Sequence, residues 1–374
     1  MSERLRITVF DKSFGRRGWL GNPESVTATI GFNVVGSAEV TFAADHPRAA
    51  DILAEGARLV IDLEGLDYPL ISGPVRSVKG SGPNARAMLT VTVEDDLRLL
   101  WRVLGWQVPS AAIGAQNTAE YRTYTGNAET IVKTMVTEQA KTRLGLPITI
   151  APNLNRGAVI PGGVKVRMHP LADRLLPAVE QAGLGVRCYQ SGAGLVLDVY
   201  EPATYPRKIS EQAGTLRSWE FSSKAPTATR VVGGGQGEGT ARTFRTAANP
   251  ALEALYGDVV EVFADARNGE TVDELNQSNS EVLFDAQPTS GLSVELSETP
   301  HFRYGVAVAV GDRVSIEAGG TTITDILRNA TITWNRADGL SIQPSVGKVE
   351  NSADAKYAQA LKALWKGLTI QKTR

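Results

Sequence analysis

The chain has 374 residues, 42% of them hydrophobic, which is enough for two or three domains with buried cores. Its formal net charge of −1 excludes a general affinity for nucleic acid or for an anionic membrane. A single cysteine, Cys188, excludes an intramolecular disulfide bond and a metal cluster built from cysteines.

Residues 1–105 are expected to form a β domain. Short segments that alternate apolar and polar residues lie between turn signals, at 5–10, 25–32, 38–42, 58–63, 70–78 and 87–93. Strands this short and this closely spaced are typical of a barrel or a sandwich. Two short helices are expected beside them, one at 47–55 capped by Asp45 and one at 95–104.

Residues 106–205 are expected to form an inserted α+β domain. An amphipathic helix is predicted at 128–144, because its apolar residues recur at helical spacing. A second helix, at 169–182, leads into a hairpin of two strands at 185–190 and 194–200. The β pattern then returns in 206–248, and we expect these strands, at 216–222, 227–233 and 242–245, to complete the first barrel.

Residues 249–350 are expected to form a second barrel or sandwich. Helical patterns at 250–257 and 270–285 precede strand patterns at 292–296, 313–317, 321–333 and 340–346. The fold class predicted from the residues is therefore mainly β with an α+β insertion, with two barrel-like domains and a C-terminal helix.

The tail, residues 351–374, is predicted to contain an amphipathic helix at 352–369. Its apolar stripe is a candidate partner-contact surface and consists of Tyr357, Leu361, Leu364, Trp365 and Leu368. Docking onto a partner and folding back onto the protein's own core explain this pattern equally well.

The glycine-rich stretch at 233–239 resembles a nucleotide-binding loop but lacks the parts that bind phosphate. Such a loop leads from a strand into a helix whose free amides face the anion. Here the following residues read as another strand, no Gly-Lys-Ser/Thr closes the loop, and Glu238 would repel a phosphate. We therefore predict a wide hairpin in which glycines adopt positive φ or allow close backbone approach.

The remaining polar residues predict no catalytic, cofactor or metal site. His46, His169 and His301 are isolated, and the chain has no zinc-protease motif and no Gly-x-Ser-x-Gly elbow. The acidic run at 94–96 lies where a strand leads into a helix, so Asp95 or Asp96 is expected to cap that helix.

An ordered set of short motifs runs through most of the chain. They are GFNVVG (31–36), AADHPR (43–48), ISGPVR (71–76), VTVEDDL (91–97), YTGNAET (124–130), GGGQGEG (233–239), EVFADAR (261–267), YGV (304–306) and VGDRV (310–314). On these motifs the chain resembles the minor tail protein family of long-tailed actinobacteriophages, which forms the central baseplate or tail-tip hub and is related to the trimeric hub of contractile tails. The shared pattern spans about 31–347.

The resemblance implies structural rather than catalytic roles for the motif residues. Those carried over are Asn33, Gly36, Asp95, Asp96, Gly233, Gly235, Gly237, Gly239, Asp265, Arg267, Gly311 and Asp312. It also implies two barrel-like tube domains per subunit and a homotrimer whose ring has pseudo-sixfold symmetry.

The partners that the resemblance implies are other tail proteins: a distal tail protein ring, the C-terminal end of the tape measure, and a central fibre, spike or receptor-binding protein. DNA would contact the ring only in transit during genome ejection. The expected location is the virion tail tip, after assembly in the host cytoplasm. No apolar run approaches the ~20 residues of a membrane span and the N-terminus is polar, so we expect no signal peptide and no stable membrane insertion.

Two other functions are kept as alternatives. A tail-tip cell-wall hydrolase would need a carboxylate pair, drawn from Glu94, Asp95, Asp96, Glu261 and Asp265. A surface-glycan binding module would use the aromatic residues Trp106, Tyr121 and Tyr124 of the inserted region.

Overall fold

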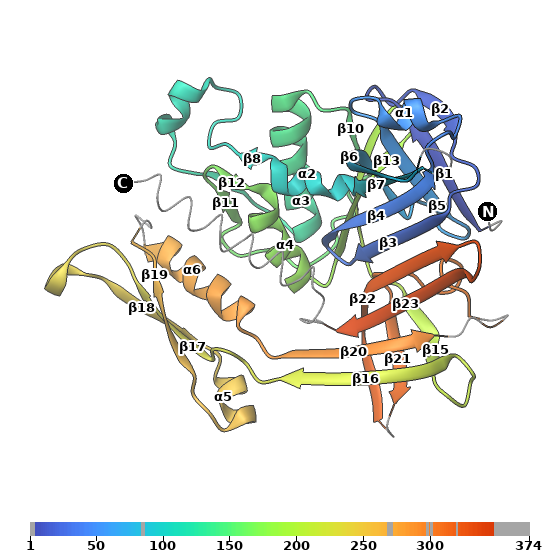
Figure 1. Ribbon diagram of the computed structural model, residues 1–374. Helices are drawn as coiled ribbons and strands as arrows, with labels where there is room; N and C mark the ends of the chain where they lie inside the picture. The colour runs from blue at the N-terminus through green and yellow to red at the C-terminus, as the bar shows by residue number, and fades with distance from the viewer. Residues whose placement is uncertain are drawn as a thin grey trace. The chain divides into compact units, whose positions relative to one another are not determined.

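The computed structural model describes residues 4–83, 87–267, 272–296, 299, 302–318 and 321–347, and these residues form a mainly β protein (Figure 1). The chain divides into two compact units. Unit 1 contains Met1–Trp219 and Val294–Ser345, and unit 2 contains Glu220–Ser293 and Val346–Arg374. The C-terminal helix expected at 352–369 lies outside the described residues.

One large sheet forms the framework of unit 1. From one edge to the other its strands run in the order β16-β20-β23-β22-β3-β4-β7-β6-β5-β1-β2, and β21 pairs with both β22 and β15. The bounds are β1 Leu5–Phe10, β2 Arg16–Trp19, β3 Ser25–Gly31, β4 Val34–Ala43, β5 Arg58–Leu63, β6 Ile71–Ser81, β7 Met88–Glu94, β15 Thr204–Ile209, β16 Leu216–Lys224, β20 Thr289–Leu296, β21 Arg313–Ala318, β22 Thr321–Asn335 and β23 Gly339–Gly347. The β16 and β20 strands carry the chain between the two units.

The strand order does not close either of the two expected barrel-like domains into a barrel. In the described residues the order is open, with β2 at one edge and β16 at the other. The β3 strand, from the first expected barrel, pairs antiparallel with β22, from the second, over Ser25↔Asn335 to Gly31↔Asn329. Alternation along a strand shows that one face is buried, but it does not specify the neighbouring strand.

The α+β part of unit 1 has its own hydrophobic core. Its elements are α2 Leu99–Arg102, β8 Leu104–Gly105, η3 Ile113–Thr118, β9 Arg122–Tyr124, α3 Ala128–Val136, the π-helix η4 Thr137–Thr142, β10 Ile148–Ile150, β11 Val164–Val166, β12 His169–Pro170, α4 Leu171–Gln181, β13 Gly185–Ser191 and β14 Gly194–Tyr200. Ile131 and Met135 of α3 pack with Leu175 of α4 and Leu197 of β14 in one cluster of buried side chains. Both expected helices are therefore confirmed, the first with a π-helical end.

The first expected helix is α1 Ala49–Leu53, and its expected cap is wrong. The residue at the N-cap position is Arg48, and no side chain caps the helix. The helix starts later than expected because residues 44–48 form turns, in which Ala49 N donates to His46 O and Arg48 N donates to His46 Nδ1. Asp45 thus lies too early in the chain to reach the first helical amides.

Unit 2 contains a small three-stranded sheet with a helix on one face. The central strand β17 Arg230–Gly234 pairs antiparallel with β18 Phe244–Ala248 and parallel with β19 Glu261–Asp265. A short helix, α5 Pro250–Tyr256, connects β18 to β19, and α6 Val272–Asp285 packs on β17 and β18. In the described part of the chain, no helix is long and apolar enough to cross a membrane.

Candidate functional site

Residues from several distant motifs meet where the large sheet of unit 1 contacts the α+β part. Asn33, in the tight turn between β3 and β4, is 3% exposed and has a left-handed φ of 57°. Its Nδ2 donates to Leu184 O at 3.0 Å, and its Oδ1 accepts from Val186 N at 2.8 Å. These two bonds give hydrogen-bond partners to buried backbone groups at the start of β13. Asn33 therefore connects the β3–β4 turn of the large sheet to the α+β part.

A buried ion pair lies at the same junction. Arg58 of β5 donates to Asp96 Oδ2 at 2.5 Å, and the two side chains are only 8% and 2% exposed. Ser72 Oγ donates to the same carboxylate oxygen at 2.8 Å and accepts from Gln190 N, while Arg58 Nε donates to Gln190 Oε1 at 2.9 Å. We call Arg58, Ser72, Asp96 and Gln190 the junction cluster. It connects β5 and β6 with β13 of the α+β part.

Asp95 and Asp96 therefore have different roles, although they are adjacent. Asp95 caps the short 3₁₀ helix Asp96–Arg98, because its Oδ1 accepts from Leu97 N at 2.7 Å. This confirms the expected cap. Burial raises the pKa of Asp95 well above its usual value. Burial also raises the pKa of Asp96, and the Arg58 guanidinium partly opposes that rise.

Two motif glycines allow close packing at this junction. A Cβ on Gly36 would lie 2.7 Å from Ile71 Cδ1, closer than real contacts allow, and 3.0 Å from Thr29 O, which is tighter than most real contacts. Gly311 has a φ of 98°, and a Cβ there would clash with the Tyr200 hydroxyl. Asp312 follows Gly311 and closes a turn, because its Oδ2 accepts from Ala309 N at 2.7 Å. Close packing therefore accounts for the glycines at 36 and 311, and the turn accounts for Asp312.

A cavity of about 80 Å³ lies beside this junction. Among its lining residues are Tyr68 and Tyr200, whose rings lie 4.4 and 4.7 Å from the Arg187 guanidinium, and the buried Cys188. Ligand pockets usually measure roughly 300–1,000 Å³, so this space can hold only a few water molecules. Burial raises the pKa of the Cys188 thiol, which disfavours the reactive thiolate.

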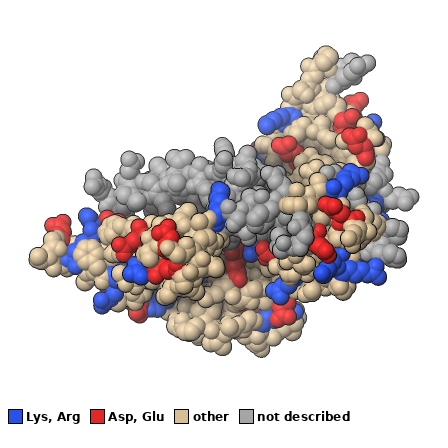
Figure 2. All heavy atoms as spheres, turned by 90° about the horizontal axis from the view of Figure 1, so that it is seen from below, with Lys and Arg blue, Asp and Glu red and all other residues tan. Residues whose placement is uncertain are grey.

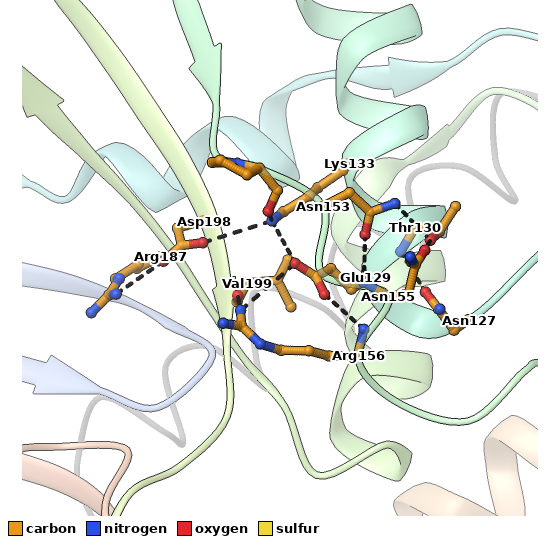
Figure 3. Close-up of polar contacts among 11 residues, drawn as sticks. Asn127, Glu129, Thr130, Lys133, Asn153, Asn155, Arg156, Arg187, Asp198 and Val199 are labelled. Atoms are coloured by element: carbon orange, nitrogen blue, oxygen red, sulfur yellow. Dashed lines mark hydrogen bonds and ion pairs between the residues drawn. The ribbon is translucent and has the colours of Figure 1, made fainter.

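A second buried polar cluster lies within the α+β part (Figure 3). Glu129 of α3 is fully buried, and its Oε1 accepts from Lys133 Nζ at 2.5 Å. Lys133 Nζ also donates to Pro152 O at 2.7 Å and lies 3.8 Å from Asp198 Oδ1. Glu129 Oε2 accepts from Arg156 N at 2.7 Å. Burial acts to raise the pKa of Glu129, but the bonds from Lys133 and Arg156 outweigh it and lower the pKa, so the carboxylate is ionised.

Asparagines fix the loop that crosses this cluster. Asn127 caps α3 by accepting from Thr130 N at 2.9 Å. Asn153 Nδ2 donates to Thr130 Oγ1 at 2.8 Å, and that hydroxyl donates to Asn155 Oδ1 at 3.1 Å (Figure 3). Every one of these oxygens therefore has a protein partner. In the described residues no group of three or more His, Cys, Asp or Glu could hold a metal ion.

The glycine-rich loop of unit 2 forms the expected hairpin. It connects β17 to β18 through a single 3₁₀ turn at Gly239–Ala241, and Gly237 and Gly239 have φ values of 97° and 54°. The strand after the loop begins at Phe244, two residues later than expected. Gly233 has no room for a side chain because the Asn279 amide lies against it, and Gly235 lies close to Thr243 Oγ1.

The polar groups of this loop exclude a phosphate cradle. Carbonyl oxygens of Gly234 and Gly235 accept from Arg242 at 3.2 Å, and Gly235 N donates to Thr243 O. Arg242 also binds Asp265 Oδ1 at 2.7 Å, and Arg267 lies 3.3 Å from Asp265 Oδ2. A phosphate site needs free amides facing the anion, whereas here the amide is used and the carbonyls face a cation. Asp265 therefore holds Arg242 of the hairpin in position, and Arg267 pairs with Asp265.

The carboxylates of the hydrolase alternative do not form a catalytic pair. Glu94 lies 2.7 Å from Arg102 and 3.3 Å from Arg76, and Asp96 is paired with Arg58. Glu261 and Asp265 belong to β19 of unit 2, whereas the run at 94–96 belongs to unit 1. Glycosidases need one protonated and one ionised carboxyl group at a set separation, whereas Glu94 and Asp96 are each paired with arginine.

The aromatic residues of the glycan alternative are largely covered by other side chains. Tyr124 is 4% exposed, and its hydroxyl donates to Glu138 Oε2 at 2.5 Å. The Arg143 guanidinium lies 4.6 Å from the Trp106 ring centre, and Lys165 and Arg167 flank Tyr121. Sugar stacking needs an open aromatic face, and each of these rings already has a cationic side chain near it.

Sequence reasoning missed most partners of the motif residues. Arg58, Ser72 and Gln190 of the junction cluster, together with Glu129 and Lys133, were not singled out. Only the spacing of Glu129 and Lys133, four apart on one helix face, gave a local signal. The other contacts join residues that are far apart in the sequence.

The chain is similar in sequence to one family of known proteins. A family model described as Siphovirus ReqiPepy6 Gp37-like protein matches residues 6–348. No curated protein matches the sequence.

Among solved structures, three tail proteins, two of them from prophages, share the fold over nearly their whole length. The 43 kDa tail protein of prophage MuSo2 from Shewanella oneidensis has a TM-score of 0.56 and 10% identity, covering 91% of this chain and 98% of its own. The tail protein from Neisseria meningitidis MC58 has a TM-score of 0.54 and 12% identity, with coverages of 93% and 97%. The prophage tail protein gp18 from Listeria monocytogenes EGD-e has a TM-score of 0.53 and 13% identity, with coverages of 96% and 99%.

Proposed function

Because the chain belongs to the Siphovirus ReqiPepy6 Gp37-like protein family, we propose that it is a structural protein of a phage tail. Its subunits form a homotrimeric hub that closes the tail tube and leaves a channel for genome ejection. The observation that carries this proposal is the family match over 6–348, almost the entire described chain. The fold shared with three tail proteins, two of them from prophages, agrees with it.

The chemistry of the polar clusters supports a structural rather than an enzymatic role. Their charged groups are paired with one another, and the cavity beside the junction cluster measures only about 80 Å³. Catalytic groups need access to a substrate and a proton to give or take, which paired and buried groups lack. The clusters instead hold the α+β part against the sheet and fix its loops.

The edges and faces of the sheets support assembly with other proteins. The sheet of unit 1 has two free edges in the described residues, and β18 and β19 are the edges of the sheet in unit 2. Phe244 and Phe263 of that small sheet are 51% and 56% exposed. Free edges and exposed aromatic side chains favour association, and a closed ring would cover them. The partners we propose are a distal tail protein ring, the end of the tape measure, and a central fibre or receptor-binding protein.

The test is the native mass of the full chain, alone and mixed with the tail-tube and distal tail proteins of the same phage, followed by particle images of each species. A ring of three subunits, alone or on its partners, supports the hub. A chain that stays monomeric in every mixture contradicts it. Release of sugars or peptides from purified cell wall by the same preparation would instead support the hydrolase alternative.

A further inference from the structure

Three arginines converge on one carboxylate at the end of β7 in unit 1. Glu94 Oε2 lies 2.7 Å from Arg102 Nη2 and 3.3 Å from Arg76 Nε. The same oxygen lies 3.9 Å from Arg98 Nε, which is too far for a hydrogen bond. We call Arg76, Arg98 and Arg102 the arginine cluster, and their side chains are 46%, 23% and 45% exposed. Three guanidinium groups that solvent can reach therefore surround a single carboxylate.

A β-bulge directs the first of these side chains. Strand β6 is in register with β7 where Val75 lies opposite Val93, but the register shifts before Ser77. Arg76 is the extra residue at this shift. Bulges bend a strand locally and re-aim the side chain of the inserted residue. The irregularity in β6 therefore brings Arg76 to the end of the neighbouring strand.

The other two arginines project from one helical segment. Arg98 is the last residue of the short 3₁₀ helix, and Arg102 is the last residue of α2. Residues four apart on a helix lie on nearly the same face. Leu97 and Leu100 of this segment are buried in the core of the α+β part, so the segment is anchored on its other side.

The other two carboxylates of the acidic run do not balance the arginine cluster. Asp96 is buried and pairs with Arg58 at 2.5 Å. Burial raises the pKa of Asp95 well above its usual value, which favours its neutral form. Burial and repulsion from the other two arginines lower the pKa of Arg98, although Asp96 and Glu94 act against this change. The cluster therefore keeps an excess of positive charge.

This positive charge is concentrated at one point of the surface. The next side chains on the same face of β7 are Thr92 and Thr90, which share hydroxyl hydrogen bonds of 2.9 Å with Ser77 and Thr41. Non-specific DNA binding needs cations spread along several phosphates. A carboxylate, in contrast, can pair with a single guanidinium group through two parallel hydrogen bonds. The cluster therefore fits carboxylates better than a nucleic acid backbone.

We propose that the arginine cluster binds an acidic segment of a partner protein, whose carboxylates pair with the three guanidinium groups. Anchoring α2 to β7 needs one arginine on Glu94, so the other two remain available to a partner. The proposal rests on the charge and geometry of unit 1 and does not depend on the hub function of the protein.

The experiment measures binding of the full-length protein to a short peptide of glutamates that carries a neutral dye, by fluorescence anisotropy at low salt. The wild type should bind a glutamine peptide of the same length at least about tenfold more weakly. Arg76→Gln with Arg102→Gln should weaken binding of the glutamate peptide by about tenfold, because two charged donors are lost. Arg6→Gln is the matched control. Arg6 is exposed and already pairs with Asp62 at 3.0 Å, so its loss should change the affinity less than about twofold.

Glu94→Gln should have the opposite effect. The glutamine keeps an oxygen that accepts from Arg102 but removes the competing negative charge. The glutamate peptide should therefore bind about threefold more tightly. Unchanged or weaker binding by this variant would contradict the excess of positive charge on which the proposal rests.

Circular dichroism of each variant shows whether it is folded, and Arg102→Gln alone provides the comparison if the double variant does not fold. Equal binding of the two peptides by the wild type would overturn the proposal, as would the absence of binding. A loss in Arg6→Gln as large as that in the double variant would show that any surface arginine serves. Tighter binding of duplex DNA than of the glutamate peptide would identify the cluster as a phosphate site instead.

Discussion

The junction cluster shows how one residue can hold two parts of the chain together. Asp96 is 2% exposed and pairs with Arg58, which in turn binds Gln190 of the α+β part. Asp96→Ala would leave Arg58 buried without its counter-charge. We expect it to lower the free energy of unfolding by about 3–5 kcal/mol, measured by urea denaturation.

An exposed ion pair of the same residue types is the control. Asp62 lies 3.0 Å from Arg6 on the neighbouring strand, with side chains 31% and 60% exposed. Surface pairs of this kind contribute about 0–1 kcal/mol, so Asp62→Ala should change the unfolding midpoint very little. Equal losses of unfolding free energy in the two variants would mean that the burial of Asp96 does not increase the contribution of its ion pair to stability.

His169 should make stability depend on pH. Burial lowers its pKa to about 4, and the neighbouring Arg174 and Arg167 add to the effect. Unfolding returns the imidazole to its ordinary pKa of 6.5, so below that pH the unfolded chain takes up a proton that the folded chain does not. The free energy of unfolding should therefore fall as pH falls from 6.5 towards 4, by up to about 3 kcal/mol.

The check is a series of urea titrations across that pH range for the wild type and for His169→Gln. The variant lacks the group, so its stability should decline less than that of the wild type. Parallel pH profiles would show that His169 is protonated equally in both states.

For single residues, the sequence predicted the role of those whose partners lie close to them in the chain. Asp95 caps a helix that starts at the next residue, and Gly237 adopts the positive φ expected in its hairpin. Arg58 and Gln190 gave no signal, because their contact joins strands 132 positions apart. Residue type and spacing carry no information about such pairs until the topology is known.

At the scale of elements, the motif glycine of β6 is a sensitive position. A Cβ on Gly73 would overlap the carbonyl oxygen of Glu94, a backbone atom of the adjacent region that cannot easily move. Gly73→Ala should therefore destabilise the sheet by several times the ~1 kcal/mol range of ordinary strand substitutions. Thermal unfolding followed by circular dichroism measures the loss.

Gly80, on the same strand, provides the matched substitution. A Cβ there would meet only Leu89 Cδ2, at 3.5 Å, which is ordinary contact. Gly80→Ala should leave the melting temperature unchanged or raise it slightly, because alanine reduces the freedom of the unfolded chain. If both substitutions lowered the melting temperature by a similar amount, the effect would come from replacing a glycine in the strand and not from the close approach at Gly73.

Most elements could be predicted from periodicity, but their neighbours could not. The strand at 5–10 and the helix at 128–144 were expected from local pattern, and the structure has β1 and α3 there. The end of that helix is π-helical, where the buried Gln139 side chain binds both backbone groups of Trp106. Such a contact involves a distant segment, so periodicity does not reveal it. Periodicity does not predict the pairing of β3 with β22 either, because these strands are also far apart in the sequence.

For the whole molecule, the charge distribution fits a passage that does not hold DNA. The formal net charge is −1, and Lys and Arg are interspersed with Asp and Glu over the face shown in Figure 2. Many of the arginines are also paired with carboxylates, as Arg102 is with Glu94. Contacts between cations and phosphates dominate non-specific DNA affinity, and each one would slow the movement of DNA past the protein.

We therefore expect the protein, in whatever oligomeric state it adopts, to bind duplex DNA no more tightly than about 10⁻⁴ M at physiological salt. Fluorescence anisotropy of a labelled duplex during titration with the protein measures this. A variant in which Glu94→Gln and Glu138→Gln free Arg102 and Arg122 from their carboxylates tests the cause, and it should bind more tightly at low salt. Micromolar or tighter binding by the wild type, with a steep salt dependence, would contradict a passive channel. In the proposed ring, the charged side chains would then hold DNA, which would favour a role in retaining the genome before ejection.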